Sequence, residues 1–429
     1  MNRILSLLCL LIILNACSNK KIINPQDYNA FLSDNKRMEK QLGKINDEIK
    51  FWGNRLTRDT GNFVDMLQLA ANHTKRFKTN GDVADLHIAD SFYVLCLHKV
   101  KASDPEIYFS VSQNAITQHR FNDAWENLVL ADSIGVNPYV LRLLRFDAAM
   151  EIGLYQQASA NIEKLSDKNN FDYLIRKAKL EDHNGNLDNA IKLMEQALKD
   201  VESKNRKPLI LWTKSNLADM YGHAGRVEEA YKNYLEVLKE DSSYLYALKG
   251  IAWIAYSHDH DTKEAKRIIN YILSQTNMPD LNLMLAEIEE WEGNKDEKKK
   301  YIDKFLSEVE KPGYGNMYNK YLVTIYTEEK QDHNKALAIA EKEVKSRPTP
   351  ETYSWLAWVS FKMGDKQKAY KLVKDHVLEK NFEPESQLQA AYILKAQGET
   401  GKAKQLLGDC MESSFELGPV TTEEIRKNF

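Results

Sequence analysis

Apolar residues follow a helical spacing through most of the chain. A short sequence motif, which we call the turn motif, interrupts them at nearly regular intervals. In its clearest copy Gly225 is followed five positions later by Ala230, with Leu217 before the turn and Tyr234 after it on the apolar stripe. The same motif begins at His119, Gly153, Gly185, His260, Gln331, Gly364 and Gly398, and Gly293 begins one further copy in which Lys298 replaces the alanine. Successive copies start 32 to 40 residues apart. A period near 34 residues is typical of arrays of helical hairpins.

Helix packing explains the two fixed residues of the turn motif, a glycine and an alanine. The glycine closes the first helix, where it adopts the left-handed backbone that a helix C-cap often needs. The alanine opens the inward face of the second helix, where two helices approach too closely for a larger side chain. Each hairpin keeps an uncovered apolar side until a neighbour stacks on it, so the hairpins must form a solenoid together. The pattern predicts an all-α fold, an α-solenoid of helix–turn–helix repeats.

The residues around these turns resemble the tetratricopeptide repeat family. That family carries a small residue seven positions before the turn, and this chain has Ala178, Ala218, Ala286, Ala357 and Ala391 there. The best two copies are residues 216–231 and 355–370, and the resemblance covers about residues 60–415. It implies a right-handed superhelix with a concave groove.

The beginning of the chain predicts export and lipidation. Residues 1–16 place Arg3 before an apolar run that is too short to span a bilayer comfortably. Leu14-Asn-Ala-Cys17 resembles a bacterial lipobox, which implies cleavage before Cys17 and acyl chains on that residue. Several acyl chains hold a protein firmly on a membrane. The alternative is an ordinary secretory signal in which the cysteine has no role.

The residues after the cysteine predict the destination. Residues 17–24 form a short polar tether, in which Ser18 directly follows the cysteine and no aspartate is present. This resembles lipoproteins of the outer membrane of Gram-negative bacteria. Lys20 and Lys21 stand where surface-exported lipoproteins of some of these bacteria carry an acidic run. We therefore expect the periplasmic leaflet rather than the cell surface.

Composition and proline placement divide the rest of the chain. A charged, amphipathic helix over 25–58 is expected to cap the first repeat, and the repeats form two segments, 59–311 and 312–415, separated by Lys311-Pro-Gly-Tyr-Gly315. Residues 416–429 lack apolar periodicity and are expected to be a poorly ordered tail. The net charge of −3 gives no nucleic-acid footprint. Cys96 and Cys410 lie near opposite ends of the array and are expected to be buried thiols.

No catalytic signature survives its context, so we expect no enzyme activity and no cofactor. The densest polar cluster is Ser257-His-Asp-His-Asp261, and His258 and His260 with two carboxylates could serve a transition metal. We favour a structural role, because a histidine near the end of a helix suits the negative end of the helix dipole. A metal-dependent enzyme centred on these histidines ranks last among the functions considered.

The resemblance places groove-lining positions two, six and thirteen residues before each turn. In this chain they are Trp212, Asp219, His223, Ile254, His258, Glu287, Trp291, Tyr318, Trp358 and Tyr392. Aromatic side chains mixed with single charges suit an extended peptide or a helix of a partner protein. The lysine–asparagine clamp with which some family members bind a C-terminal carboxylate is missing, which disfavours that ligand.

These observations predict a non-catalytic, membrane-anchored scaffold that binds a partner protein or peptide in its groove. The alternative is a glycan- or nutrient-binding surface lipoprotein, similar to the starch-binding outer-membrane lipoproteins. Those proteins carry long loop-rich insertions, and intervals of 32 to 40 residues leave little room for them here. The sequence fixes neither the partner nor the oligomeric state.

Overall fold

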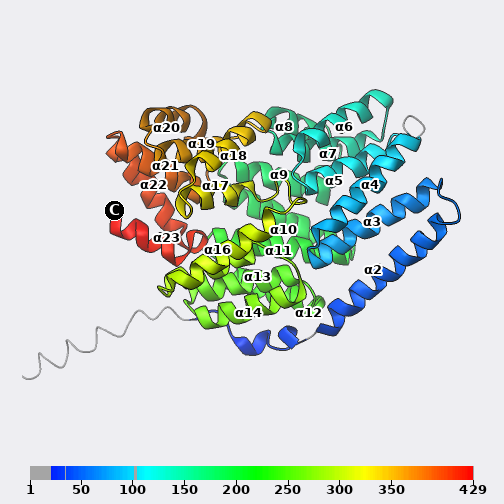
Figure 1. Ribbon diagram of the computed structural model, residues 1–429, viewed down its shortest axis with the longest axis horizontal. Helices are drawn as coiled ribbons and strands as arrows, with labels where there is room; N and C mark the ends of the chain where they lie inside the picture. Colours follow the sequence, from blue (N-terminus) through cyan, green and yellow to red (C-terminus); the bar gives the residue numbers. More distant parts are fainter. Residues whose placement is uncertain (1–20, 34, 101–103, 429) are drawn as a thin grey trace, which may run out of the picture.

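The structure is a computed structural model that describes residues 21–33, 35–100 and 104–428. The predicted signal peptide, Cys17 and most of the tether lie outside these residues. Every regular element in the described ranges is a helix, and the helices pair into antiparallel hairpins that stack side by side (Figure 1). The predicted all-α solenoid of helical hairpins is confirmed.

The hairpins follow one another along the chain without interruption by any other element of the described residues. The earlier ones are α3 (Phe63–Asn80) with α4 (Val83–Val100), α5 (Ile107–Thr117) with α6 (Phe121–Ile134), α7 (Pro138–Glu151) with α8 (Tyr155–Glu163), α9 (Phe171–His183) with α10 (Leu187–Ser203), and α11 (Lys207–His223) with α12 (Val227–Glu240). The later ones are α13 (Leu245–Trp253) and the π-helix η5 (Ile254–His258) with α14 (Thr262–Gln275), α15 (Leu281–Trp291) with α16 (Lys295–Val309), α17 (Asn319–Glu328) with α18 (His333–Ser346), α19 (Pro350–Lys362) with α20 (Lys366–Leu372) and the π-helix η6 (Val373–Val377), and α21 (Pro384–Ala396) with α22 (Thr400–Glu412).

The turn residues adopt the backbone conformation that the turn motif requires. All the glycines that begin the turn motif have positive φ. His119 (φ 55°), His260 (φ 54°) and Gln331 (φ 54°) also have positive φ, and at these positions a side chain makes that conformation costly. The alanines five positions later are 0 to 1% exposed. The turn motif of the sequence therefore corresponds to a structural repeat, in which a left-handed turn is followed by a close helix crossing.

Helix α8 offers a matched test of the close crossing. Ala158 is fully buried in the core between hairpins, whereas Ala160 in the same helix is exposed. Overpacking a buried alanine forces shifts that cost about 1–3 kcal/mol. We expect Ala158→Leu to lower the free energy of unfolding by that amount in urea denaturation. Ala160→Leu should change it by no more than about 0.5 kcal/mol, and an equal loss from both variants would contradict the crossing.

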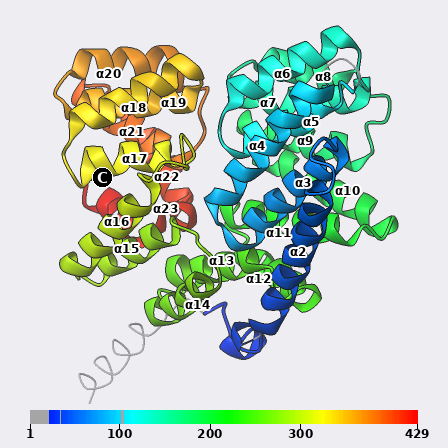
Figure 2. The same cartoon turned by 45° about the vertical axis from the view of Figure 1, so that its right-hand side comes forward.

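The array closes on itself, so that early hairpins contact late ones. The imidazole Nε2 of His87 in α4 lies 2.9 Å from the carbonyl oxygen of Gly313, 226 residues further on. Asn122 in α6 donates to the Ser346 hydroxyl (2.8 Å) at the end of α18, 224 residues further on. Figure 2 shows the two flanks, α3–α11 and α15–α22, joined by α12–α14. One superhelical turn thus returns the chain to its own beginning.

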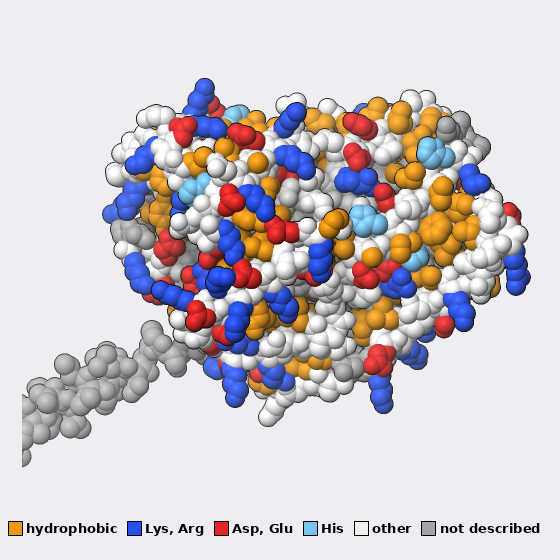
Figure 3. Space-filling model, in the orientation of Figure 1, with side chains coloured by type: hydrophobic (Ala, Val, Ile, Leu, Met, Phe, Trp, Pro, Cys, Tyr) orange, Lys and Arg blue, Asp and Glu red, His pale blue; other side chains and the backbone are white. Residues whose placement is uncertain are grey.

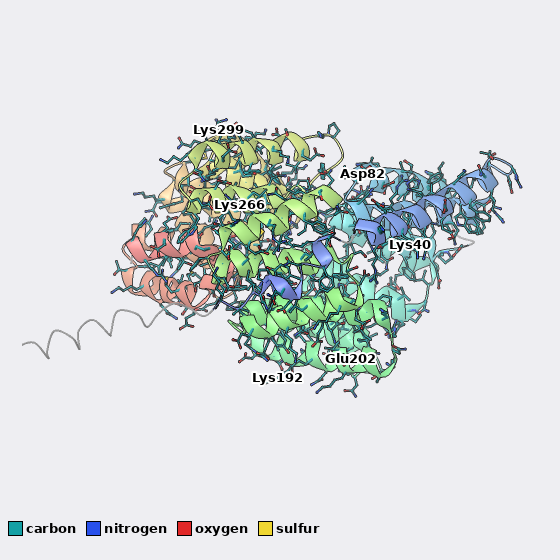
Figure 4. All side chains as sticks on the ribbon, turned by 90° about the horizontal axis from the view of Figure 1, so that it is seen from below. Lys40, Asp82, Lys192, Glu202, Lys266 and Lys299 are labelled. Carbon is teal, nitrogen blue, oxygen red and sulfur yellow. The ribbon has the colours of Figure 1, made fainter. Side chains whose placement is uncertain are left out.

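The N-terminal region differs from the single capping helix that was expected. It contains two short 3-10 helices, η2 (Pro25–Asp27) and η3 (Phe31–Ser33), before α2 (Asn35–Leu56). Helix α2 packs on α3, but residues 21–33, which we call the N-terminal strap, lie across α12 and α14 (Figure 4). Tyr28 is fully buried there, and its hydroxyl donates to Glu264 of α14 (2.7 Å).

The C-terminal residues also differ from the expected tail, because they form α23 (Ser414–Asn428). The helix is broken at Gly418 (φ 76°, ψ 169°), and Pro419 begins its second half, as suits a proline at a first helical position. Ile425 is fully buried against α21 and α22. The break resets the helical phase, so the apolar residues on either side of it share no single period.

The face of the molecule that Figure 3 shows carries no single sign of charge over a large area. Lys and Arg side chains alternate with Asp and Glu over the face in Figure 3. None of the helices within the described ranges combines the length and the apolar character that a bilayer crossing requires. Cys96 and Cys410 are both buried, as expected.

Candidate partner-binding groove

The concave side of the late hairpins forms a groove against α23. A cavity of about 1080 Å³ lies between the first helices of these hairpins, α15, α17, α19 and α21, and the C-terminal helix. Three predicted residues line it together: Glu287, Trp358 and Tyr392. Each stands six residues before a turn glycine, so the repeat places them at equivalent positions on α15, α19 and α21. We call this space the concave groove.

One wall of the concave groove is an aromatic platform. The Trp358 ring stacks on Phe361 (centroids 5.5 Å apart, planes at 22°) and on Tyr392 (6.2 Å, 29°). The indole N–H of Trp358 donates to Glu328 (2.6 Å), and the Lys362 ammonium lies 4.7 Å from the ring centroid. The platform is therefore held in a fixed orientation and offers flat apolar area.

The opposite wall is acidic. Glu287 accepts a hydrogen bond from the Tyr256 hydroxyl (3.1 Å), and burial raises the pKa of its carboxyl to about 7, with Glu290 raising it further and Lys298 opposing. Burial also raises the pKa of Glu416 in α23, against the effect of His223, whose Nδ1 lies 3.7 Å away. The Glu287 carboxyl can therefore donate or accept a hydrogen bond near neutral pH.

The raised pKa of Glu287 predicts a pH dependence of stability. Its folded pKa of about 7 exceeds the ordinary value of 4.5, so unfolding releases a proton and stability falls as pH rises between these values. We expect Glu287→Gln to raise the urea midpoint relative to wild type at pH 8 but not at pH 4.5. Glu229→Gln is the control, because Arg226 lowers the pKa of Glu229. A Glu287→Gln effect that is the same at both pH values would contradict the prediction.

A smaller cavity of about 180 Å³ adjoins the groove between α11, α13 and α23. Asp219 and His223 line it, as predicted positions on α11, and Phe415 of α23 closes it. Asp219 accepts hydrogen bonds from the Tyr246 hydroxyl (2.7 Å) and from Tyr234, and burial raises the pKa of its carboxyl. Asp219 is therefore occupied by two tyrosines, while His223 faces α23.

Two predicted residues, Ile254 and His258, do not face the groove, and this prediction was wrong. Ile254 is fully buried in the core, and His258 lies beside the N-terminal strap. The reason is η5, in which the Asp259 N–H bonds to the Ile254 carbonyl five residues earlier and one extra residue enters the helix. The groove-facing positions move back by one residue, to Trp253 and Ser257. An indole N–H that needs a polar partner was the available signal.

Three other predicted residues lie elsewhere and do not join this site. Trp212 is 38% exposed in a separate cavity of about 750 Å³ between α11 and α2–α3. Trp291 stacks on His260 at the turn edge (5.6 Å), and Tyr318 packs edge-on against Phe305 (5.6 Å). Their spacing from the turn is regular, but none of the three lines the concave groove.

The polar cluster of residues 257–261 joins the two ends of the chain. Asp259 accepts the backbone N–H groups of Ile22 (3.0 Å) and Ile23 (2.9 Å), and Asp261 pairs with Lys21 (2.6 Å). Within the ranges that the structure describes, no group of three His, Cys, Asp or Glu side chains comes close enough to bind a metal. The carboxylates that a metal at His258 would need are directed at the N-terminal strap.

Solved structures that match the chain are tetratricopeptide repeat proteins, as the sequence pattern predicted. A tetratricopeptide repeat protein from Parabacteroides merdae is 17% identical, with 60% of this chain and 96% of that chain covered and a TM-score of 0.35. Yeast Tom70 is 13% identical, with 94% and 97% covered and a TM-score of 0.33. YrrB, described as having an unusual peptide-binding site, is 14% identical, with 46% and 95% covered and a TM-score of 0.27.

At such low identities and TM-scores these matches add nothing about function, and the hairpin array is established by the helices and turns of this chain. No family model and no curated protein matches the sequence. With the π-helices counted as parts of their helices, the longest connection between successive helices in the described residues is 310–318. No described insertion therefore resembles the loop-rich ligand sites of the starch-binding lipoproteins.

Proposed function

We propose that the protein is a non-catalytic scaffold that holds a segment of a partner protein in the concave groove. The observation that carries this proposal is the groove of about 1080 Å³ with an aromatic platform on one wall and buried carboxyls on the other. Aromatic anchors in a water-excluding pocket supply most of the energy of typical protein interfaces. A groove built on rigid helices also lowers the ordering cost of binding.

A photoreactive amino acid in place of Tyr392 tests this proposal in the native membrane. The control places the same group at Lys299, whose side chain is 71% exposed on the outer surface (Figure 4). We expect one protein adduct from position 392, its loss when Trp358→Ala is added, and no such adduct from position 299. Adducts that are identical from both positions, or that survive Trp358→Ala in a folded protein, would remove the scaffold proposal.

We further propose that lipid on Cys17 tethers the scaffold to the outer membrane, in the periplasmic leaflet. Three residues separate Cys17 from Lys21, which is paired with Asp261 at the turn between η5 and α14. An extended chain covers about 3.3–3.6 Å per residue, so the anchor would hold that turn within about 15 Å of the bilayer. The turn edge of α12–α14 would then face the membrane.

The tether has its own test. We expect Cys17→Ala to move the protein from the membrane fraction to the soluble fraction, and protease added to intact cells to spare the wild-type protein. Membrane retention of the variant would disprove the lipid anchor. Digestion in intact cells would disprove the periplasmic leaflet without affecting the anchor.

A further inference from the structure

The first half of α23 is held by groove side chains that bind its main chain. The Phe415 carbonyl accepts two hydrogen bonds, from the Trp253 indole N–H (3.0 Å) and from the Ser257 hydroxyl (2.6 Å). Both donors occupy the positions that η5 moves onto the concave face. Contacts to a carbonyl do not depend on the side chain of the bound residue, so these two donors would fix any segment that follows the same path.

A side-chain pocket lies beside these donors. Gly222 is the penultimate residue of α11, and a Cβ on it would lie 2.6 Å from the Phe415 ring. The missing Cβ therefore leaves the space that the ring occupies. The cavity of about 180 Å³ continues beyond the ring. The pocket therefore accepts an aromatic side chain.

The next three residues of the segment each have a distinct environment. Glu416 faces His223 at 3.7 Å, and Leu417 packs on the apolar cluster of α19–α22. Gly418 has φ 76°, and a Cβ on it would lie 2.4 Å from the Glu287 carboxyl, so only glycine fits. The groove thus selects an aromatic, an acidic, an apolar and a glycine residue in this order.

The docked segment also meets opposition from the groove. Burial raises the pKa of the Glu416 carboxyl, although His223 and Lys320 oppose this rise. Docking of the segment therefore includes the cost of burying this carboxyl. A segment held in this way, at the end of the chain, can exchange with a competitor that makes the same contacts.

We propose that this part of the concave groove is a peptide receptor that the chain's own residues 415–418 occupy at rest. A partner protein binds by presenting an aromatic–acidic–apolar–glycine sequence that displaces them. This inference rests on the proposed scaffold function and names the partner chemistry and the regulation of the same site. The segment keeps the receptor closed until a partner with that sequence is present.

The test measures binding of a fluorescein-labelled peptide of residues 411–428 to the full chain by fluorescence anisotropy. Phe415→Ala in the protein removes the ring of the resident segment and leaves the pocket open. A tethered segment competes at an effective concentration near the millimolar range. We expect the variant to bind the peptide at least about 100-fold more tightly than wild type does. Hydrogen exchange of residues 414–428 should rise in the same variant.

Gly222→Ala provides the matched control. Its methyl group enters the ring pocket, and alanine is compatible with the last turn of a helix, so this variant should release the resident segment, shown by exchange, and yet bind no peptide. A peptide with Phe415→Ala should bind neither variant. Peptide affinity that is equal in wild type and Phe415→Ala, or protection of residues 414–428 that Phe415→Ala leaves unchanged, would overturn the inference.

The two proposals fail separately. Partner adducts from position 392 without peptide binding would refute only the receptor sequence proposed here. Peptide binding without partner adducts in the native membrane would refute the scaffold function and leave the closed groove as a structural cap.

Discussion

Phe305→Ala should lower the free energy of unfolding by about 3–5 kcal/mol, as truncation of a fully buried phenylalanine usually does. Phe305 in α16 is fully buried and meets the rings of Tyr318 (5.6 Å) and Tyr321 (6.1 Å) edge-on. Tyr318 and Tyr321 flank the start of α17, directly after the connection 310–318. The cavity left by the ring would open the joint between the two parts of the array. Urea denaturation followed by circular dichroism gives the measurement.

Phe51→Ala is the control for this loss. Phe51 in α2 is 53% exposed and touches Trp52 edge-on. We expect this variant to cost no more than about 1 kcal/mol. If Phe305→Ala lowers the free energy of unfolding by no more than Phe51→Ala does, the α16–α17 joint is not packed as described.

Asp259→Ala should release the N-terminal strap. The buried Asp259 carboxylate accepts from the N–H groups of Ile22 and Ile23 and lies 2.7 Å from Nδ1 of His258. Losing it leaves buried donors unpaired, which costs about 1–3 kcal/mol for each group. A total near 3 kcal/mol corresponds to more than about 100-fold faster hydrogen exchange at Ile22 and Ile23. Exchange measured by mass spectrometry reads these amides directly.

Lys21→Ala separates the buried contact from the surface one. Lys21 is exposed and its ion pair with Asp261 lies at the surface, where such pairs contribute at most about 1 kcal/mol. We expect less than a tenfold change in exchange at the same amides. Equal changes in the two variants would show that Asp259 does not anchor the N-terminal strap.

The repeat could be predicted from sequence because its signals are local. A left-handed turn favours glycine, and a close helix crossing favours alanine, so the turn motif at Gly225 and Ala230 can be explained from local structure alone. The same locality placed Glu287, Trp358 and Tyr392 correctly on one concave surface. These residues lie on helices without a π-turn, so their spacing from the turn is not shifted, although the equivalent residue of α17, Ile325, is buried in the core.

The remainder depended on structure that no local signal encodes. One extra residue in η5 moved the concave positions from Ile254 and His258 to Trp253 and Ser257. Closure of the array depends on small rotations summed over many hairpins, so the contacts of residues 224 and 226 positions apart could not be read from any one repeat. The C-terminal helix escaped notice because Gly418 divides its apolar pattern.

Closure is the central claim about the fold, because it brings early and late hairpins into contact, and a disulfide tests it most directly. Asn122→Cys with Ser346→Cys places two thiols where side chains 224 residues apart now touch at 2.8 Å, while the native Cys96 and Cys410 are buried. Under mild oxidation the double variant should form an intramolecular disulfide, seen as linked peptides by mass spectrometry, and neither single variant should. Failure of the folded double variant to form this bond would contradict the closed array.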